Sequence, residues 1–272
     1  MSRIASRFES LKSSGRKALV PFITAGDPSP EAAVPVMHAL VRGGADILEV
    51  GVPFSDPMAE GPVIQHASER ALTHNVSLRD VLAMVQQFRH EDQETPVILM
   101  GYLNPVEVMG YAKFAQAAAA AGVDGVLTVD LPPEEAEDFT RELALKHIDP
   151  IFLLAPTSTA ERMRRVAAAA RGFIYYVSLR GVTGASNMNT AEVHDKLEQI
   201  RQFTKLPLGV GFGIKDPETA AAVAGVADAI VVGSALVARL ARVNGGVDKI
   251  AEEAEQFMAV LRTAIDEVGV SA

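Results

Sequence analysis

The chain contains no cysteine and no tryptophan among its 272 residues. Without cysteine, disulfide bonds, a zinc site with Cys ligands, an iron–sulfur cluster and thiol catalysis are all excluded. Basic residues are the minority, because 25 Lys and Arg stand against 34 Asp and Glu and leave a net charge of −9. This acidic balance argues against nonspecific binding to nucleic acid. No apolar run approaches the length of about 18 residues that a membrane-spanning helix needs, so no membrane segment is predicted.

A secretory signal peptide is not expected, because two arginines interrupt the first seven residues, where an apolar run would stand. We therefore expect the protein to be cytoplasmic. Residues 2–13 instead place Ile4, Phe8 and Leu11 at helical spacing. This spacing predicts a short amphipathic helix that is capped by Gly15.

Short runs rich in Val, Ile, Leu and Phe alternate with longer helical patterns along the rest of the chain. Such apolar strands, joined by helices, are typical of a parallel sheet that is covered on both faces. Eight strands in about 250 residues is the count of a TIM barrel, and an open doubly wound sheet is the alternative. No Gly-x-Gly-x-x-Gly follows the first strand, and no Pro- or Ser-rich linker divides the chain. We predict an α/β fold, a (β/α)8 TIM barrel with an extra N-terminal helix, spanning residues 1–272 as a single domain.

The expected strands are residues 18–24, 47–52, 97–102, 125–129, 150–154, 173–177, 207–211 and 229–232. The expected helices after the first are residues 30–41, 63–74, 78–90, 106–121, 134–147, 160–170, 191–203, 218–223, 234–242 and 247–268. A short phrase that starts with Gly and ends with Asp closes three of these helices, at residues 44–46, 122–124 and 225–228. Gly suits the helix C-cap and Asp suits the turn, so the same helix-to-strand connection is predicted three times.

The active sites of TIM barrels lie at the C-terminal ends of the strands. In the second expected strand, Ile47, Glu49 and Gly51 share one face. If this face points into the barrel, Glu49 is a lone carboxyl group among apolar layers. Burial would then raise its pKa and make it a candidate general acid or base. The alternative is that Glu49 faces the helices and pairs with a Lys or Arg.

The next loop, residues 53–62, contains three prolines and the carboxylates Asp56 and Glu60. Glu60 could supply a second carboxylate at the mouth of the barrel, and the alternative is a solvated turn. Glycines gather after the last three strands, at residues 181–184, 211–213 and 233–234. Glycine lets backbone N–H groups approach an anion, and TIM barrels bind phosphate after strands seven and eight. We therefore predict a phosphate site there.

Alternation along the strands predicts that several apolar side chains point into the barrel. There they could line a cavity for a flat apolar group, and the alternative is that they form an ordinary core. The six His residues show no metal-ligand spacing, so no metal is expected. The residues alone thus indicate a phosphate-handling barrel enzyme with carboxylate catalysis. The side chains predicted to point into the barrel are Phe22, Met100, Tyr102, Leu127, Val129, Leu153, Tyr175 and Phe212.

Residues 48–62, LEVGVPFSDPMAEGP, closely resemble the signature of the tryptophan synthase alpha chain family. Residues 101–105, 130–133, 181–184 and 211–214 also fit this family, and the resemblance runs from Arg7 to about Ile265. It implies a TIM barrel that cleaves indole-3-glycerol phosphate to indole and glyceraldehyde 3-phosphate. It also implies a beta-chain partner in an α2β2 complex, which joins indole to serine. The pyridoxal phosphate belongs to that partner, and this chain needs no cofactor.

The resemblance also assigns roles to residues. Glu49 matches the principal acid–base residue, and Glu60 matches the second carboxylate, which accepts the indole N–H. Thr183 lies on a loop that is expected to close over the substrate. The phosphate would meet Gly184, Gly213, Gly233 and Ser234, and the pocket positions are Phe22, Met100, Tyr102, Leu127, Tyr175 and Phe212. The face that meets the beta chain would include Pro53, Asp56, Pro57, Asn104 and Pro132.

This chain departs from the family pattern at three places. Glu60 stands where the family usually has Asp, Met100 replaces a more usual Leu, and Arg180 lies one position later than expected. Since Glu is one methylene longer than Asp, we expect the loop backbone to sit further back. Two other functions compete with the lyase. Another phosphate-binding barrel enzyme would leave residues 53–62 unexplained, and a chain that mainly activates its beta partner would follow if Glu60 weakened the chemistry.

Overall fold

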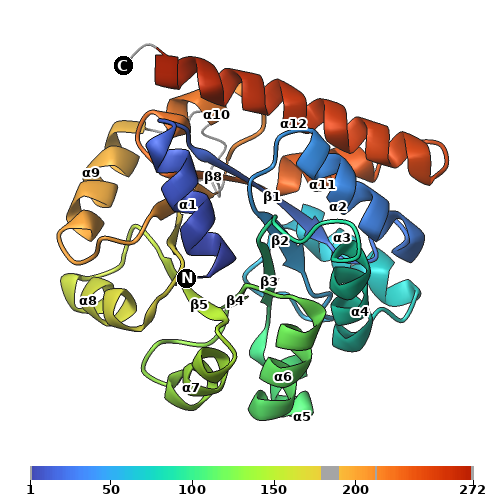
Figure 1. Cartoon of the computed structure of the whole chain (residues 1–272), viewed down its shortest axis with the longest axis horizontal. Helices are drawn as coiled ribbons and strands as arrows, with labels where there is room; N and C mark the ends of the chain where they lie inside the picture. The colour runs from blue at the N-terminus through green and yellow to red at the C-terminus, as the bar shows by residue number, and fades with distance from the viewer. Residues whose placement is uncertain (1, 179–189, 212, 271–272) are drawn as a thin grey trace.

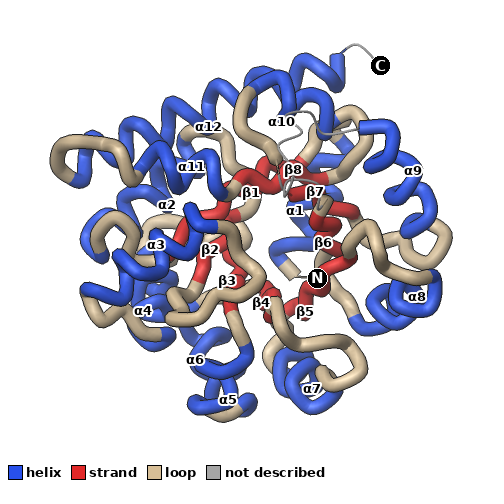
Figure 2. The backbone as a smooth tube through the Cα atoms, turned by 180° about the vertical axis from the view of Figure 1, so that it is seen from behind, coloured by secondary structure: helices blue, strands red, loops and turns tan. Residues whose placement is uncertain are grey.

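The computed structural model describes residues 2–178, 190–211 and 213–270. Its eight strands are all parallel and each pairs with the next in sequence, and β8 pairs with β1 to close the barrel. Figure 2 shows the strands as a continuous ring. The prediction of a TIM barrel is confirmed, and the open doubly wound sheet is excluded by the pairing of β1 with β8. The strands are β1 (Ala18–Thr24), β2 (Leu48–Gly51), β3 (Val97–Gly101), β4 (Gly125–Thr128), β5 (Asp149–Leu154), β6 (Ile174–Val177), β7 (Leu208–Gly211) and β8 (Ala229–Val232).

Helices surround the strands and cover the outer face of the barrel (Figures 1 and 2). One helix prediction is wrong: residues 106–121 do not form a single helix, because Gly110 has a φ of +87° and separates α5 from α6. After the first helix, α1 (Arg3–Ser13), the helices are η1 (Pro30–Ala32), α2 (Ala33–Arg42), α3 (Pro62–Thr73), α4 (Leu78–Phe88), α5 (Leu103–Met109), α6 (Tyr111–Ala121), α7 (Glu137–Leu145), α8 (Ala160–Ala169), α9 (Thr190–Arg201), α10 (Pro217–Ala224), α11 (Ser234–Leu240) and α12 (Val247–Val270).

The helix α1 covers the end of the barrel at which the strands begin (Figure 1). Its apolar face carries Ile4, Phe8 and Leu11, which are buried against inward-facing residues of the strands. The helix ends as predicted, because Gly15 has a φ of +69° and the N–H of Arg16 donates to the carbonyl oxygen of Leu11 at 2.8 Å. Since α1 closes this end, the cavity can open only at the other end, where the strands finish.

The three recurring Gly-to-Asp phrases do more than turn the chain. In each one the Asp carboxylate accepts a hydrogen bond from the backbone N–H that begins, or nearly begins, the preceding strand. This bond ties the start of a strand to the connection that follows the next helix, so it fixes neighbouring strands relative to one another. The pairs are Asp46 with Leu19, Asp124 with Val97, and Asp228 with Leu208, each at 2.9 Å.

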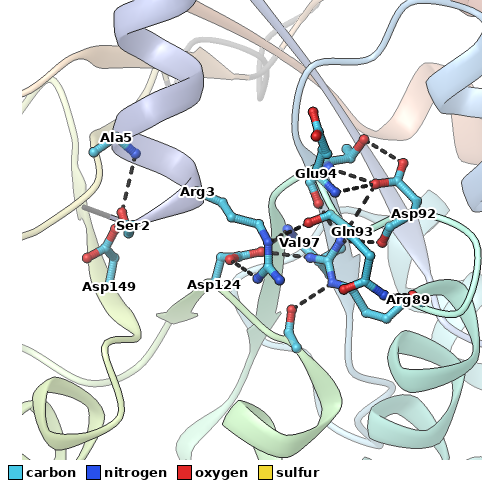
Figure 3. A network of polar contacts seen from close by, with 12 residues as sticks. Ser2, Arg3, Ala5, Arg89, Asp92, Gln93, Glu94, Val97, Asp124 and Asp149 are labelled. Carbon is cyan, nitrogen blue, oxygen red and sulfur yellow. Dashed lines mark hydrogen bonds and ion pairs between the residues drawn. The ribbon is translucent and has the colours of Figure 1, made fainter.

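Asp124 also lies in a buried ion pair beneath the barrel (Figure 3). The Nη2 atom of Arg89 donates to Asp124 at 2.7 Å, and Arg3 of α1 donates to the other carboxylate oxygen at 2.8 Å. The side chains of Arg89 and Asp124 are only 6% and 5% exposed. Arg89 also donates to the carbonyl oxygens of Gly122 and Thr95, so both buried charges are compensated.

Replacing Arg89 with Met should lower the free energy of unfolding by about 3 kcal/mol or more, because it leaves the Asp124 charge with only the partly exposed Arg3. Urea unfolding at neutral pH measures this change. Arg141→Met is the matched control, since Arg141 pairs with exposed acids, and it should change the free energy by at most about 0.5 kcal/mol. Equal losses in the two variants would contradict the role given to the buried pair.

Candidate functional site

Glu49 lies inside the barrel. It pairs in register with Phe22 of β1 and Ile98 of β3, and its side chain faces inward with theirs. The residue is 1% exposed, and neither carboxylate oxygen hydrogen bonds to any residue that the structure describes. The alternative, in which Glu49 faces the helices and pairs with a cation, is therefore not what the structure shows.

Burial raises the pKa of Glu49 to about 8, and the nearby charge of Glu60 adds to this increase. The cause is desolvation, because the apolar interior disfavours the charged carboxylate. A carboxyl group with this pKa is mainly protonated at neutral pH and can both give and take a proton. Tyr175 is close enough to be affected, and its pKa is raised well above its ordinary value by burial and then by the charges of Glu49 and Glu60.

Glu60 belongs to the loop that joins β2 to α3, and its side chain lines a small cavity with Phe22, Met100 and Tyr102. Burial raises the pKa of the Glu60 carboxyl. Within the loop, the N–H of Glu60 donates to the carbonyl oxygen of Pro57 at 3.0 Å. The loop is therefore partly folded over the cavity, and the alternative of a fully solvated turn does not describe Glu60.

Two other predicted pocket residues lie deeper. Leu127 is fully buried in the apolar cluster inside the barrel, and Tyr175 packs against the same cluster. The Tyr175 hydroxyl approaches Gly211 so closely that a Cβ at Gly211 would lie 2.2 Å from it, which explains the glycine there. Val129 and Leu153 pack against the same cluster, whereas Phe212 lies outside the described residues.

Thr24 was missed by the sequence reasoning. Its side chain lines the cavity that contains Glu60, it is 3% exposed, and its hydroxyl has no hydrogen-bond partner among the described residues. Strand alternation from Phe22 would have placed Thr24 on the same inward face. A buried hydroxyl without a partner is costly, so its place in this cavity makes it a candidate substrate contact.

The predicted phosphate residues lie at the ends of β7 and β8. Gly233 precedes α11, and the first turn of that helix has no side-chain cap, so its N–H groups remain available to an anion. A Cβ at Gly233 would lie 3.7 Å from Phe22, which puts this helix start beside the cavity. Ser234 begins α11, and Gly213 has a φ of +80°. Thr183 and Gly184 lie outside the described residues.

The predicted partner-facing residues lie on two loops and on α5, at the same end of the barrel as the cavity. Asp56 and Asn104 are exposed, Pro132 is half-buried, and Pro53 and Pro57 are buried within this chain. Two apolar side chains that the sequence reasoning did not single out are strongly exposed at this end. They are Met58, which is 87% exposed, and Val108, which is 84% exposed. Met58 belongs to the loop between β2 and α3, and Val108 belongs to α5.

The described residues contain no group of three or more His, Asp and Glu side chains that could hold a metal ion. No helix among them is both long enough and apolar enough to cross a bilayer.

Comparisons with known proteins agree with this geometry. A family model described as "Tryptophan synthase alpha chain" matches residues 8–266. A protein of that name from Thioalkalivibrio sulfidiphilus is 60% identical over 98% of this chain and 100% of its own length. Its counterpart from Nitrosococcus oceani is 59% identical over 98% of both chains. A crystal structure of tryptophan synthase subunit alpha from Legionella pneumophila has a TM-score of 0.91 and 48% identity, and the match covers 98% of this chain and 99% of that one.

The stability of the protein should depend on the protonation of Glu49. Because its pKa is about 8 when folded and 4.5 by default, the folded chain holds a proton that the unfolded chain releases between these pH values. The resulting stability is complete below pH 4.5 and is lost as the pH rises through about 8. The Gln side chain of the Glu49→Gln variant cannot titrate. As the pH rises through this window, the free energy of unfolding of the variant, relative to that of the parent, should therefore increase by about 1.4 kcal/mol per pH unit. Urea unfolding at several pH values tests this, and parallel curves would contradict it.

Proposed function

Because the chain belongs to the tryptophan synthase alpha chain family, and is therefore the lyase subunit that cleaves indole-3-glycerol phosphate, we propose that Glu49 carries out the proton transfers of this cleavage. The observation that supports the proposal is a carboxyl group inside the barrel with a pKa of about 8. In addition, neither of its oxygens has a partner among the described residues, so the group is free to act on a substrate.

The cleavage needs two proton transfers. Indole C3 must gain a proton, which makes the ring an electron-poor indolenine, and the side-chain hydroxyl must lose one as the aldehyde forms. Protonated Glu49 can supply the first proton, and the carboxylate left behind can accept the second. The electrons of the broken carbon–carbon bond return to the indole ring, and the products are indole and glyceraldehyde 3-phosphate. A carboxyl group whose pKa lies near the working pH suits both transfers.

Glu60 is the second carboxylate in this proposal. It would accept the indole N–H and stabilise the positive charge that develops on the ring after C3 is protonated. The support is that its side chain lines the same cavity and its charge affects Glu49. In this proposal the loop backbone sits further back than in relatives with the usual Asp, which makes room for the longer side chain of Glu60.

The rest of the proposed site holds the two ends of the substrate. We assign the indole ring to the aromatic and apolar interior, where Phe22 and Met100 line the cavity beside Glu60. Tyr102, Leu127, Tyr175 and Phe212 complete this set, and Thr183 belongs to the loop that would close over the substrate. The phosphate would bind to backbone groups of Gly184, Gly213, Gly233 and Ser234. Binding the phosphate would hold the glycerol chain in register with Glu49.

We also propose that the whole chain acts as a single domain that pairs with a tryptophan synthase beta chain in an α2β2 complex. This chain would hold no cofactor, and the pyridoxal phosphate would belong to the partner, which receives the indole. The support is that Asp56 and Met58, on the loop after β2, and Asn104 and Val108, on α5, are exposed beyond the C-terminal ends of the strands, while Pro132, after β4, is half-buried. Loops that meet both substrate and partner could couple the two sites.

Glu49→Gln should reduce indole release from indole-3-glycerol phosphate by about 1,000-fold or more, because the amide can neither give nor accept the proton. The Kd for indole-3-glycerol phosphate, measured by calorimetry, should change by less than about threefold, because the phosphate and indole contacts remain. If a folded Glu49→Gln variant lost binding as well, Glu49 would have a structural role instead.

A beta chain should raise indole release from this chain sharply, which is measured by mixing the two chains at increasing beta concentration. The molecular mass of the complex formed in the mixture should match two copies of each chain.

Glu60→Asp should keep indole release within about tenfold of the parent. An increase of about 100-fold in that variant, equivalent to about 2.7 kcal/mol, would instead support a chain that mainly activates its partner.

A further inference from the structure

Tyr102 follows β3 and contacts the Glu60 loop, residues 53–60, at two places. Its hydroxyl accepts a hydrogen bond from the backbone N–H of Ala59 at 2.9 Å. Its ring stacks on that of Phe54, with the centroids 5.0 Å apart and the planes 21° from parallel. Tyr102 itself is only 6% exposed, whereas Phe54 is half-buried and Ala59 is exposed. One side chain therefore fixes both the start and the end of this loop.

The contact with Ala59 has no substitute. The hydrogen bonds that Asp56, Pro57, Met58 and Glu60 make lie within the loop and shape its turns. Among the residues that the structure describes, the bond from Ala59 to Tyr102 is the only hydrogen bond between residues 53–60 and the rest of the chain. The backbone position of Glu60, which follows Ala59 directly, therefore depends on the Tyr102 hydroxyl.

Tyr102 is also connected, through the residue that follows it, to the segments that contain the predicted partner-facing residues. The backbone N–H of Leu103, the residue after Tyr102, donates to the Asp130 carboxylate at 2.8 Å. Asp130 lies in the loop after β4 that also contains Pro132, and Leu103 is the first residue of α5, which contains Asn104. Burial raises the pKa of Tyr102 to about 12, and the charges of Glu60 and Asp130 add to the increase, so both carboxylates lie near it.

We propose that Tyr102 is a positioning residue: its hydroxyl holds the Ala59–Glu60 backbone in place and links it, through Leu103 and Asp130, to the surface that faces the beta chain. This inference rests on the proposed role of Glu60 in the cleavage. Its physical basis is that a displacement of about 1 Å at a reacting group can reduce the rate about 100-fold. A carboxylate on a loop that makes a single hydrogen bond to the rest of the described chain is sensitive to such a displacement.

Tyr102→Phe is the first test, because it removes the hydroxyl and keeps the ring that stacks on Phe54 and lines the cavity. With saturating beta chain, kcat for indole release should fall about 30-fold. The KM should change less than about threefold, because the substrate contacts of the ring remain. Tyr111→Phe is the matched control, since that hydroxyl donates to the exposed Glu107 of α5, and it should keep kcat within about twofold. An unchanged kcat in Tyr102→Phe would overturn the proposal.

A double-variant cycle separates positioning from direct contact with the substrate. If Tyr102 acts through Glu60, adding Tyr102→Phe to Glu60→Gln should lower kcat by less than about twofold further. If the two losses multiply, Tyr102 acts on the substrate itself and the proposal is wrong. The underlying role of Glu60 is judged separately: should Glu60→Gln alone retain full kcat, the proposed function of Glu60 fails, whatever Tyr102→Phe does.

The link to the partner is tested with Asp130→Ala, which removes the acceptor of the Leu103 N–H. The factor by which saturating beta chain stimulates indole release should fall about fivefold. Adding Tyr102→Phe to this variant should reduce the factor little further, because both changes break the same connection. Stimulation equal to that of the parent would show that the link through Leu103 and Asp130 does not exist.

Discussion

A carboxyl group buried without a partner is the constraint on which the rest of this structure depends. Glu49 lies among apolar side chains inside the barrel, and burial keeps it protonated up to about pH 8. Two other buried carboxylates form ion pairs with arginine: Asp124 pairs with Arg89, and Asp46 pairs with Arg262. The fold therefore neutralises buried charge wherever it only supports the barrel. Neither carboxylate oxygen of Glu49, the proposed acid–base group, has a partner among the described residues.

The barrel and its orientation could be predicted because they depend on local patterns. Continuous apolar runs gave the bounds of β1 and β8 correctly, and the alternation within one strand pointed to Glu49. The break at Gly110 was missed because an isolated glycine within a helical pattern is usually tolerated. For Asp124 the turn was expected, but its bond to Val97 was not, because no local pattern reveals a partner 27 residues away.

In the candidate site, too, the features that depend on local patterns could be predicted and those that depend on tertiary contacts could not. The residue types and their strand positions were accessible from the sequence, whereas the burial of Pro53 and Pro57 and the bond from Ala59 to Tyr102 depend on how a loop folds back. The roles of the matched residues came from resemblance to a family, not from spacing. At the mouth of the barrel, residues 53–60 contain both Glu60, which lines the cavity, and the exposed Met58, so the contacts that shape this loop affect both the proposed catalytic group and the proposed docking face.

The closure of the barrel floor by α1 also has a consequence for how the chain is made. This helix is synthesised before every strand of the barrel, yet Arg3 contacts Asp124 and Phe8 packs on Phe173, which are synthesised much later. Its apolar face must stay uncovered while more than half of the chain emerges, and β1 must wait still longer for β8. Such distant pairings slow folding and expose apolar surface to aggregation. The helix that closes the floor of the finished barrel is thus one of the last parts of the growing chain to be buried.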